Sequence, residues 1–273
     1  MHLKKLYLPL FFFFLLTVVV DAQHWRAGTA VTLPQNEFAI GSYQPSRYGV
    51  FNDLEIAAHP FFFTALPHLH IKKQWLNRKM KIASRHSFLY PTWALKLGKT
   101  VKEDWYERPG DPIPSLLYTR HEFLLSRYFK RCSCCPFTYL ATLKAGISTG
   151  FSFDSLNGPV INYPLLHMRS LNFQEDYIAN LGFDLEGQLH PKIDFSVDAD
   201  YRLAWNAKVQ SVEHKALIIY KPVNYVYFMG GYKFIWTDAQ NIKPWSLYPM
   251  IDLVFYFARE TQPKNGLMRK GWF

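Results

Sequence analysis

Between Leu181 and Leu203, apolar and polar residues alternate almost without interruption on both sides of the turn His190-Pro191-Lys192. Alternation with a period of two is typical of β-strands whose two faces meet different surroundings. Pairing Leu189 with Ile193 across the turn keeps the apolar residues of both runs on one side. The segment therefore predicts a β-hairpin with one apolar and one charged face. The apolar face must pack against either a protein core or lipid.

The N-terminus predicts export from the cytoplasm. Lys4 and Lys5 precede an apolar run from Leu6 to Val20, and the residues around Ala22 suit cleavage. This order is that of a secretory signal peptide, here residues 1–22. A membrane anchor helix is the alternative, but the run is shorter than the roughly 20 residues that a span needs and contains Pro9. The later sequence offers no helical span, so a membrane form of this chain would be a β-barrel.

Aromatic residues make up 18% of the chain and charged residues 19%, while the mean hydropathy is only −0.11. In membrane barrels, tryptophan and tyrosine form girdles where the strands cross the headgroup region. Several such residues lie at or near the ends of predicted strands, and ordinary core packing is the alternative for each one. Together they favour girdles. The residues are Trp75, Tyr90, Trp93, Trp205, Trp236, Trp245 and Tyr248.

The sequence predicts an all-β chain that forms an antiparallel up-and-down transmembrane β-barrel of about 12 strands, with 10 or 14 as alternatives. The barrel is expected over residues 23–258, followed by a basic, disordered periplasmic tail over residues 259–273. The aromatic-rich final strand resembles a barrel insertion signal. The strands are expected at 37–43, 49–58, 66–76, 79–89, 92–97, 116–129, 137–151, 170–189, 193–205, 212–221, 223–236 and 247–257.

Connection lengths support a membrane barrel, in which the periplasmic turns are short and the outer loops are longer. With the N-terminus in the periplasm, the connections after even-numbered strands should be the short ones. The turns at 190–192 and 221–222 follow even strands, whereas the loops at 98–115, 152–169 and 237–246 follow odd strands. The first and third connections are short exceptions. The alternation therefore supports the barrel without deciding it.

The first predicted hairpin carries a resemblance to known proteins. Residues 29–34 read TAVTLP, residues 40–49 read IGSYQPSRYG, and Asp53-Leu54-Glu55-Ile56 and His59-Pro60 follow. This segment resembles the N-terminal part of uncharacterised outer-membrane β-barrel proteins of Gram-negative bacteria, of the Bacteroidetes type. The resemblance is close only here and extends over the remaining chain by pattern. It implies the fold and an outer-membrane location, and it transfers no activity and no catalytic residue.

Carboxylates gather on the charged face of the Leu181 to Leu203 hairpin. A charge that faces lipid near the midplane costs about 2–4 kcal/mol, so this face should line the lumen. Asp184 then lies opposite Asp198, and like charges in that position repel. The cluster therefore requires cations from other strands or a bound hard cation. The candidate lumen residues are Asp184, Glu186, Asp194, Asp198 and Asp200, with Lys144, Arg202, Arg127 or Arg169 as basic partners.

Three interpretations of this cluster stay open. The first is an ion-pair network that fills a small barrel, the second is a selectivity ring of a cation-conducting pore, and the third is a calcium-type site. About twelve strands place the barrel between small filled barrels and open porins, so a wide channel does not follow from the strand count. The sequence predicts no metal and no cofactor.

Catalysis on membrane lipid is the alternative to a structural or transport role. His86 and Ser87 are adjacent on a predicted strand and point to opposite faces, so they cannot act together. Ser84 and His86 share a face, but a separation of two positions is expected to be too long for a hydrogen bond. The chain also contains no G-x-S-x-G motif. No catalytic residue is therefore predicted.

Cys132, Cys134 and Cys135 form a crowded triplet in an expected periplasmic turn. A structural zinc site normally takes four ligands in two spaced pairs, which this triplet does not provide. No function is predicted for the triplet, with a local disulfide as the alternative.

A net charge of +10 fits contact with outer-membrane lipid and anionic lipopolysaccharide, while export argues against nucleic acid as a partner. The outer-membrane insertion machinery is the other expected partner. The predicted function is a structural or small-solute transport barrel with a charged lumen that a plug can close. The alternatives are a lipid-modifying enzyme, a subunit of an envelope complex, and a soluble periplasmic β-sandwich or lipocalin-like barrel.

Overall fold

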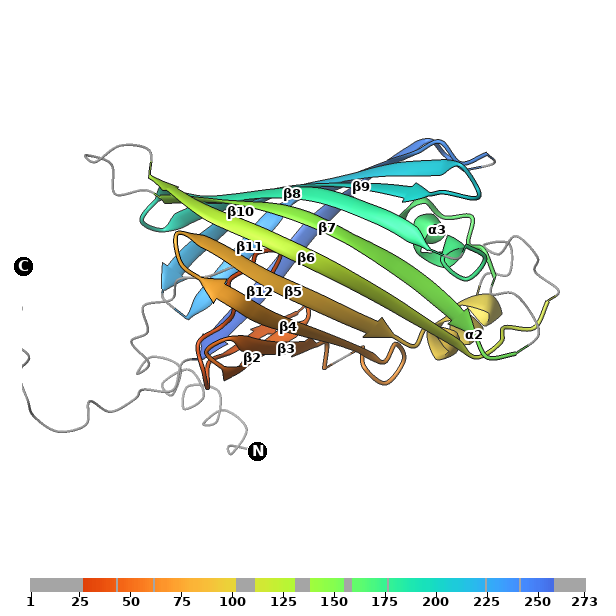
Figure 1. The fold of residues 1–273 in the computed structure, drawn as a ribbon, viewed down its shortest axis with the longest axis horizontal. Helices are drawn as coiled ribbons and strands as arrows, with labels where there is room; N and C mark the ends of the chain where they lie inside the picture. Colours follow the sequence, from red (N-terminus) through yellow and green to blue (C-terminus); the bar gives the residue numbers. More distant parts are fainter. Residues whose placement is uncertain are drawn as a thin grey trace, which may run out of the picture.

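The computed structural model describes residues 27–42, 44–60, 62–101, 111–130, 138–154, 159–175, 177–223, 225–240 and 242–257. Within these residues, twelve antiparallel strands follow one another around a closed barrel (Figure 1). β1 closes the barrel by pairing with β12. The prediction of an all-β barrel of twelve strands is confirmed. The predicted signal peptide, the cysteine triplet and the predicted tail at 259–273 lie outside the described residues.

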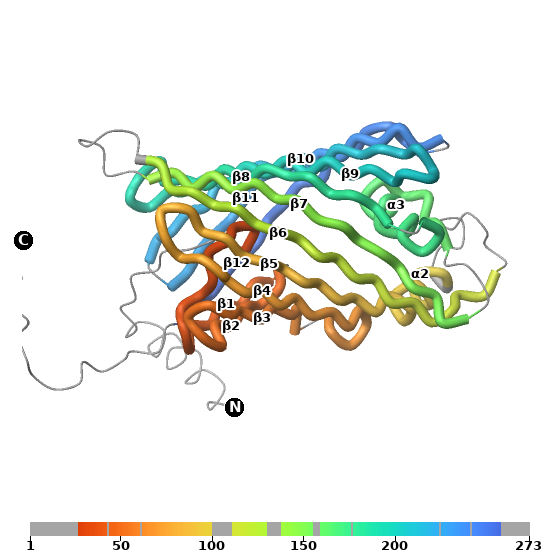
Figure 2. The backbone as a smooth tube through the Cα atoms, in the orientation of Figure 1, coloured from red at the N-terminus to blue at the C-terminus, as the bar shows by residue number. Residues whose placement is uncertain are grey.

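The strands are short at the start of the chain and long afterwards. β1 to β3 have 4, 6 and 5 residues, whereas β6 and β7 have 15 each and run the length of the barrel (Figure 2). The bounds are β1 Phe38–Gly41, β2 Ser46–Phe51, β3 Leu54–Ala58, β4 His68–Asn77, β5 Met80–Leu89, β6 Leu116–Lys130, β7 Thr138–Ser152, β8 Ile178–His190, β9 Ile193–Ala204, β10 Val209–Val223, β11 Val226–Thr237 and β12 Trp245–Phe257.

Two differences from the predicted strands leave the number of strands at twelve, because one adds a strand and the other removes one. The expected strand at 49–58 is two strands, β2 and β3, because Asn52 and Asp53 favour a turn. The expected strand at 92–97 is instead the start of helix α2, Thr92–Val101. A short apolar run does not distinguish a strand from a helix, and the preceding Pro91 suits a helix start.

The expected strand at 170–189 also began too early. Its first residues belong to helix α3, Pro164–Leu171, and β8 starts only at Ile178. Pro164 occupies the first turn of α3, where its missing N–H costs nothing because that group has no partner within the helix.

The connections are sorted by length between the two ends of the barrel. The turns 52–53, 78–79, 191–192 and 224–225 all follow even-numbered strands and lie at one end, the short-turn end. The loops 59–67, 90–115 and 153–177 follow odd-numbered strands, and the helices α2 and α3 lie together at this loop end (Figure 1). The turn at 78–79, the third predicted connection, follows β4 and fits the alternation. The connections 42–45 and 205–208 follow odd-numbered strands but are short, and they are exceptions to this sorting.

The polarity of the barrel is reversed relative to a water-soluble protein. Leu143 and Ile251 are 57% and 76% exposed on the outside, whereas Asp184 and Thr142 are 2% and 0% exposed inside. Soluble proteins bury apolar residues and seldom bury carboxylates. The apolar face of the β8–β9 hairpin thus points outward, and its acidic face points into the lumen.

The register of that hairpin agrees with the prediction along its length and differs at the turn. Asp184 lies opposite Asp198, and Gln188 lies opposite Asp194. Ile193 pairs with His190 and not with Leu189, because an irregularity shifts the register between Gln188 and His190. The faces of both strands are unchanged by this local shift.

Apolar residues inside the barrel gather towards its two ends. At the loop end, Met168 and Leu171 of α3 pack with Ile178 and Ala204, and α3 also contacts β11 and β12 across the lumen. At the short-turn end, a second cluster joins β1, β10, β11 and β12 to Leu33, which precedes the first strand. None of the helices among the described residues is long and apolar enough to cross a membrane.

Candidate functional site

Residues 27–35 precede β1 and pack against inward-facing side chains; we call them the lumen segment. Thr29 and Ala30 are completely buried. The Ala30 N–H donates to Ser126 Oγ of β6 at 2.8 Å, and the Ala30 carbonyl accepts from Gln74 Nε2 of β4 at 2.7 Å. The lumen segment therefore satisfies polar groups that line the barrel.

The lumen segment also reaches other strands. The Ala27 carbonyl accepts from Arg85 Nη1 of β5 at 3.0 Å, and the Leu33 N–H donates to Glu55 Oε2 of β3 at 2.8 Å. On the far side, a Cβ added at Gly28 would lie 2.1 Å from Asp184 Oδ2 of β8. The segment thus crosses the interior from β3–β6 to β8, and it lies so close to β8 that a side chain at residue 28 would displace the Asp184 carboxylate.

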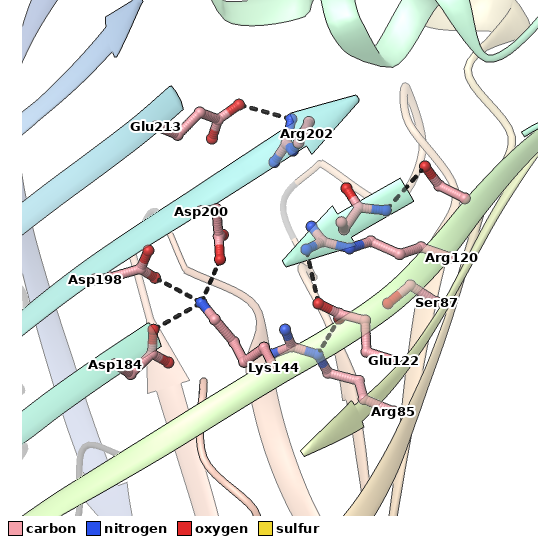
Figure 3. Close-up of polar contacts among 12 residues, drawn as sticks. Arg85, Ser87, Arg120, Glu122, Lys144, Asp184, Asp198, Asp200, Arg202 and Glu213 are labelled. Carbon is pink, nitrogen blue, oxygen red and sulfur yellow. Dashed lines mark hydrogen bonds and ion pairs between the residues drawn. The ribbon is translucent and has the colours of Figure 1, made fainter. Parts of the chain in front are cut away.

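The predicted acidic cluster surrounds a single lysine (Figure 3). Lys144 Nζ of β7 lies 2.6 Å from Asp184 Oδ1, 2.6 Å from Asp200 Oδ1 and 3.4 Å from Asp198 Oδ2. Asp198 also meets Lys215 Nζ of β10 at 3.2 Å. The lysines offset the repulsion that the opposed Asp184 and Asp198 would otherwise suffer.

The other predicted lumen residues have different partners from those expected. Arg202 Nη1 lies 2.6 Å from Glu213 Oε1 and does not join the acidic cluster, while Asp194 pairs with Lys221 at 2.7 Å. Glu186 is buried in the lumen wall. Arg127 is wrong as a lumen residue: its side chain is exposed and stacks on Phe129, because the even-numbered residues of β6 are the ones that face inward.

Three buried glutamates that the prediction missed each meet two or more cations. Glu122 of β6 lies 2.7 Å from both an Arg85 and an Arg120 nitrogen (Figure 3). The other ion pairs are Glu55 with Lys72 and Arg47, and Glu213 with Arg202, Lys233 and Arg169. Around these glutamates the cations exceed the carboxylates, which disfavours a purely acidic selectivity ring. Their signal in the sequence was a charged residue at every second position, as in Arg120-His121-Glu122.

Among the described residues, no group of three or more His, Cys, Asp or Glu side chains is arranged to hold a metal ion. The oxygen ligands of the acidic cluster instead surround Lys144, whose ammonium group occupies the position that a hard cation would take.

A second polar cluster lies on the outside of the barrel, formed by Ser84 and His86 of β5, His121 of β6 and Trp75 of β4; we call it the outer-wall patch. Ser84 Oγ lies 3.2 Å from His86 Nε2, and His86 Nδ1 lies 2.8 Å from His121 Nδ1. The prediction that Ser84 and His86 are too far apart is therefore wrong. An imidazole can extend along the strand and reach the residue two positions away.

The outer-wall patch faces outward because the alternating residues of β5 face inward. Ala83 and Ser87 are buried, and Arg85 binds the lumen segment. Trp75 is 65% exposed, and its Nε1–H donates to Ser84 Oγ at 2.9 Å.

No protein-family model matches this chain, and no curated protein matches it significantly. We therefore infer the function from the fold and from the side chains described above.

Proposed function

We propose that the protein is an integral β-barrel of the outer membrane of a Gram-negative bacterium, with both termini in the periplasm. The observation that carries this proposal is the reversed polarity of the barrel. Large apolar side chains such as Leu143, Phe183 and Ile251 are exposed outside, while Lys144 and Asp184 are buried inside. Lipid stabilises this arrangement, because it solvates apolar side chains and excludes charges from the outer face.

Two further features support the membrane location. Trp205, Trp236 and Trp245 are exposed at the loop ends of β9, β11 and β12, where an aromatic girdle would meet the headgroups. The short turns gather at the opposite end, as periplasmic turns do. The signal-peptide pattern supplies the export route, and the insertion machinery and outer-membrane lipid, including lipopolysaccharide, are the proposed partners.

The role that we propose is structural, with the lumen closed at rest. The lumen segment crosses the interior, Lys144 and the surrounding carboxylates occupy its middle, and α3 packs into the loop end. Passage of a small solute would require the lumen segment to move. The excess of cations around the buried glutamates would then favour anionic solutes.

Membrane fractionation tests the proposal. The full chain is expected to enter the outer-membrane fraction, to float with phospholipid vesicles and to migrate faster on a gel when unheated than when boiled. All three results follow from a closed barrel that binds lipid on its outside. A chain that stays in solution without detergent and shows no heat-dependent migration would rule the membrane barrel out.

A further inference from the structure

The outer-wall patch is unusually polar for a lipid-facing surface. Outward residues of β8 and β9 are apolar, among them Leu181, Phe183 and Val197. On β5 and β6, by contrast, two histidines and a serine face outward at adjoining positions, with His86 paired directly to His121. Polar groups in contact with lipid are costly and usually mark function. A hydrogen-bonded polar cluster at this position therefore indicates a functional site.

The three side chains have the order of a nucleophile, a base and a group that orients the base. Ser84 can donate its hydroxyl proton to His86 Nε2, which lies 3.2 Å away. In that tautomer His86 carries its proton on Nδ1 and donates it to His121 Nδ1 at 2.8 Å. One set of tautomers thus satisfies both contacts. This is the arrangement that activates a serine for attack on a carbonyl carbon.

The surroundings of Ser84 suit the substrate of such a serine. Trp75 Nε1–H donates to Ser84 Oγ at 2.9 Å and holds the hydroxyl oxygen beside His86. Leu69, Phe88 and Phe123 are large apolar side chains exposed on the same strands, β4 to β6, where an acyl chain can lie. The exposed side of the patch therefore combines one polar donor with an apolar surface.

A cation lies beside the serine. Lys73 is the register partner of Ser84 and forms an ion pair with Asp53 in the turn between β2 and β3. The hydrogen bond from Lys73 lowers the pKa of Asp53, so the Asp53 carboxylate stays charged at neutral pH. Lys73 also pairs with Leu54, the first residue after that turn, which places the cation towards the short-turn rim. A phosphate headgroup at this rim would meet the ammonium group of Lys73.

We propose that the outer-wall patch is a serine esterase site that cleaves an ester-linked acyl chain from membrane phospholipid. The proposal rests on the membrane location proposed above. Under that orientation the short-turn rim meets the periplasmic leaflet, which consists of phospholipid. Ser84 is the nucleophile, His86 is the general base and acid, and His121 is a positioning residue that acts through His86.

The reaction has two steps, acylation of Ser84 and hydrolysis of the acyl-serine. Ser84 Oγ bonds to the ester carbonyl carbon and its proton passes to His86 Nε2; the carbon–oxygen ester bond then breaks, and His86 protonates the lysophospholipid alkoxide. Water next attacks the acyl-serine and gives its proton to His86. The acyl–Oγ bond breaks, Ser84 Oγ takes the proton back, and a free fatty acid leaves.

Covalent labelling of the purified full chain in detergent tests the site. A fluorophosphonate probe is expected to add to the peptide that contains Ser84, and Ser84→Ala should abolish the adduct. His86→Asn should slow labelling at least about 100-fold, the usual loss when a general base is removed. Ser87→Ala is the matched control: Ser87 Oγ also lies 2.7 Å from a histidine, His70 Nδ1, but faces the closed lumen. An unlabelled Ser84 in a heat-modifiable, folded barrel would overturn the proposal.

The role of His121 is tested by replacing the group that accepts from His86 Nδ1–H. His121→Phe removes that acceptor and should slow labelling of Ser84, whereas His121→Gln keeps an acceptor and should restore most of the wild-type rate. Equal labelling rates for wild type and both variants would show that His121 does not position His86.

Substrate assays separate the lipid sources. Phosphatidylethanolamine vesicles are expected to yield free fatty acid with the wild-type protein and none with Ser84→Ala. Release from lipopolysaccharide alone, or a Ser84 adduct without release from phospholipid, would overturn the phospholipid assignment. Flotation distinguishes the two proposals. A protein that carries the Ser84 adduct but does not float with vesicles contradicts only the membrane location. A protein that floats but carries no adduct contradicts only the esterase site.

Discussion

Lys144 is the cation that three carboxylates of the lumen wall share. Its ammonium group holds Asp184, Asp198 and Asp200 together, and all four side chains lie in the lumen wall. Alternation of residues along β7, β8 and β9 was sufficient to predict that these groups face inward. Their partners were harder to predict. Arg202 pairs with Glu213 because the register places Ser211 opposite Arg202 and Glu213 two residues further along β10, on the same face.

Replacement of Lys144 tests how much that ammonium group stabilises the barrel. Lys144→Met leaves three carboxylates without their shared cation, and loss of one partner from a buried ion pair typically costs about 3–5 kcal/mol. The urea midpoint of the detergent-folded protein, followed by the loss of the fast-migrating gel band, should fall. Lys192→Met, in the exposed turn between β8 and β9, is the control and should leave the midpoint unchanged. Equal midpoints for both variants would mean that the acidic cluster contributes little.

Gly182 tests the same cluster through its packing. A Cβ added there would lie 2.0 Å from Asp200 Oδ1 and 2.5 Å from Lys144 Cε. Gly182→Ala should therefore destabilise the barrel by about 1–3 kcal/mol, the usual cost of overpacking. Gly230→Ala is matched to it, because nothing lies within 4 Å of a Cβ added at that strand position. Urea unfolding of the two variants should separate them, and a smaller effect at Gly182 than at Gly230 would contradict the packing.

At the scale of elements, the prediction was most accurate where a strand has two different faces. β7 and β9 alternate cleanly and were placed to within one residue at each end, whereas the start of β8 was placed too early, in α3. α2 was mistaken for a strand because its short apolar run carries no clear period. The lumen segment had no local signal at all. Its position depends on hydrogen bonds to Ser126 and Gln74, which are far away in the sequence. Likewise, the contact of Ser84 with His86 depends on a side-chain rotamer that alternation does not determine.

The lumen segment is the element expected to keep the barrel closed. In planar bilayers the wild-type protein should give no conductance steps, and a variant without residues 27–33 should give discrete steps, because the deletion removes the contacts of the segment with β3–β6 and β8. A variant that keeps the length but carries Ser126→Ala and Gln74→Ala should show brief openings. A deletion variant that folds and stays silent would mean that the remaining lumen side chains and α3 close the barrel by themselves.

At the scale of the whole molecule, the reversed polarity predicts that an arginine on the outer face has different effects on stability in lipid and in water. Leu143 is 57% exposed at the middle of β7, and Leu189 is 50% exposed beside the turn that follows β8. In water, arginine at either exposed position would be nearly neutral. In a bilayer, arginine costs about 2–4 kcal/mol near the midplane and about 0–1 kcal/mol near the interface.

Leu143→Arg should therefore reduce the stability of the vesicle-folded barrel by about 2–4 kcal/mol, and Leu189→Arg should change it little. Urea titration of the folded fraction in phospholipid vesicles measures both variants under identical conditions. The difference between them depends on depth alone, since both replace an outward leucine of similar exposure with the same residue. If the two variants were equally stable in vesicles, the outer face of β7 would not lie in the hydrocarbon region, and the apolar exterior would have to be covered by another protein surface.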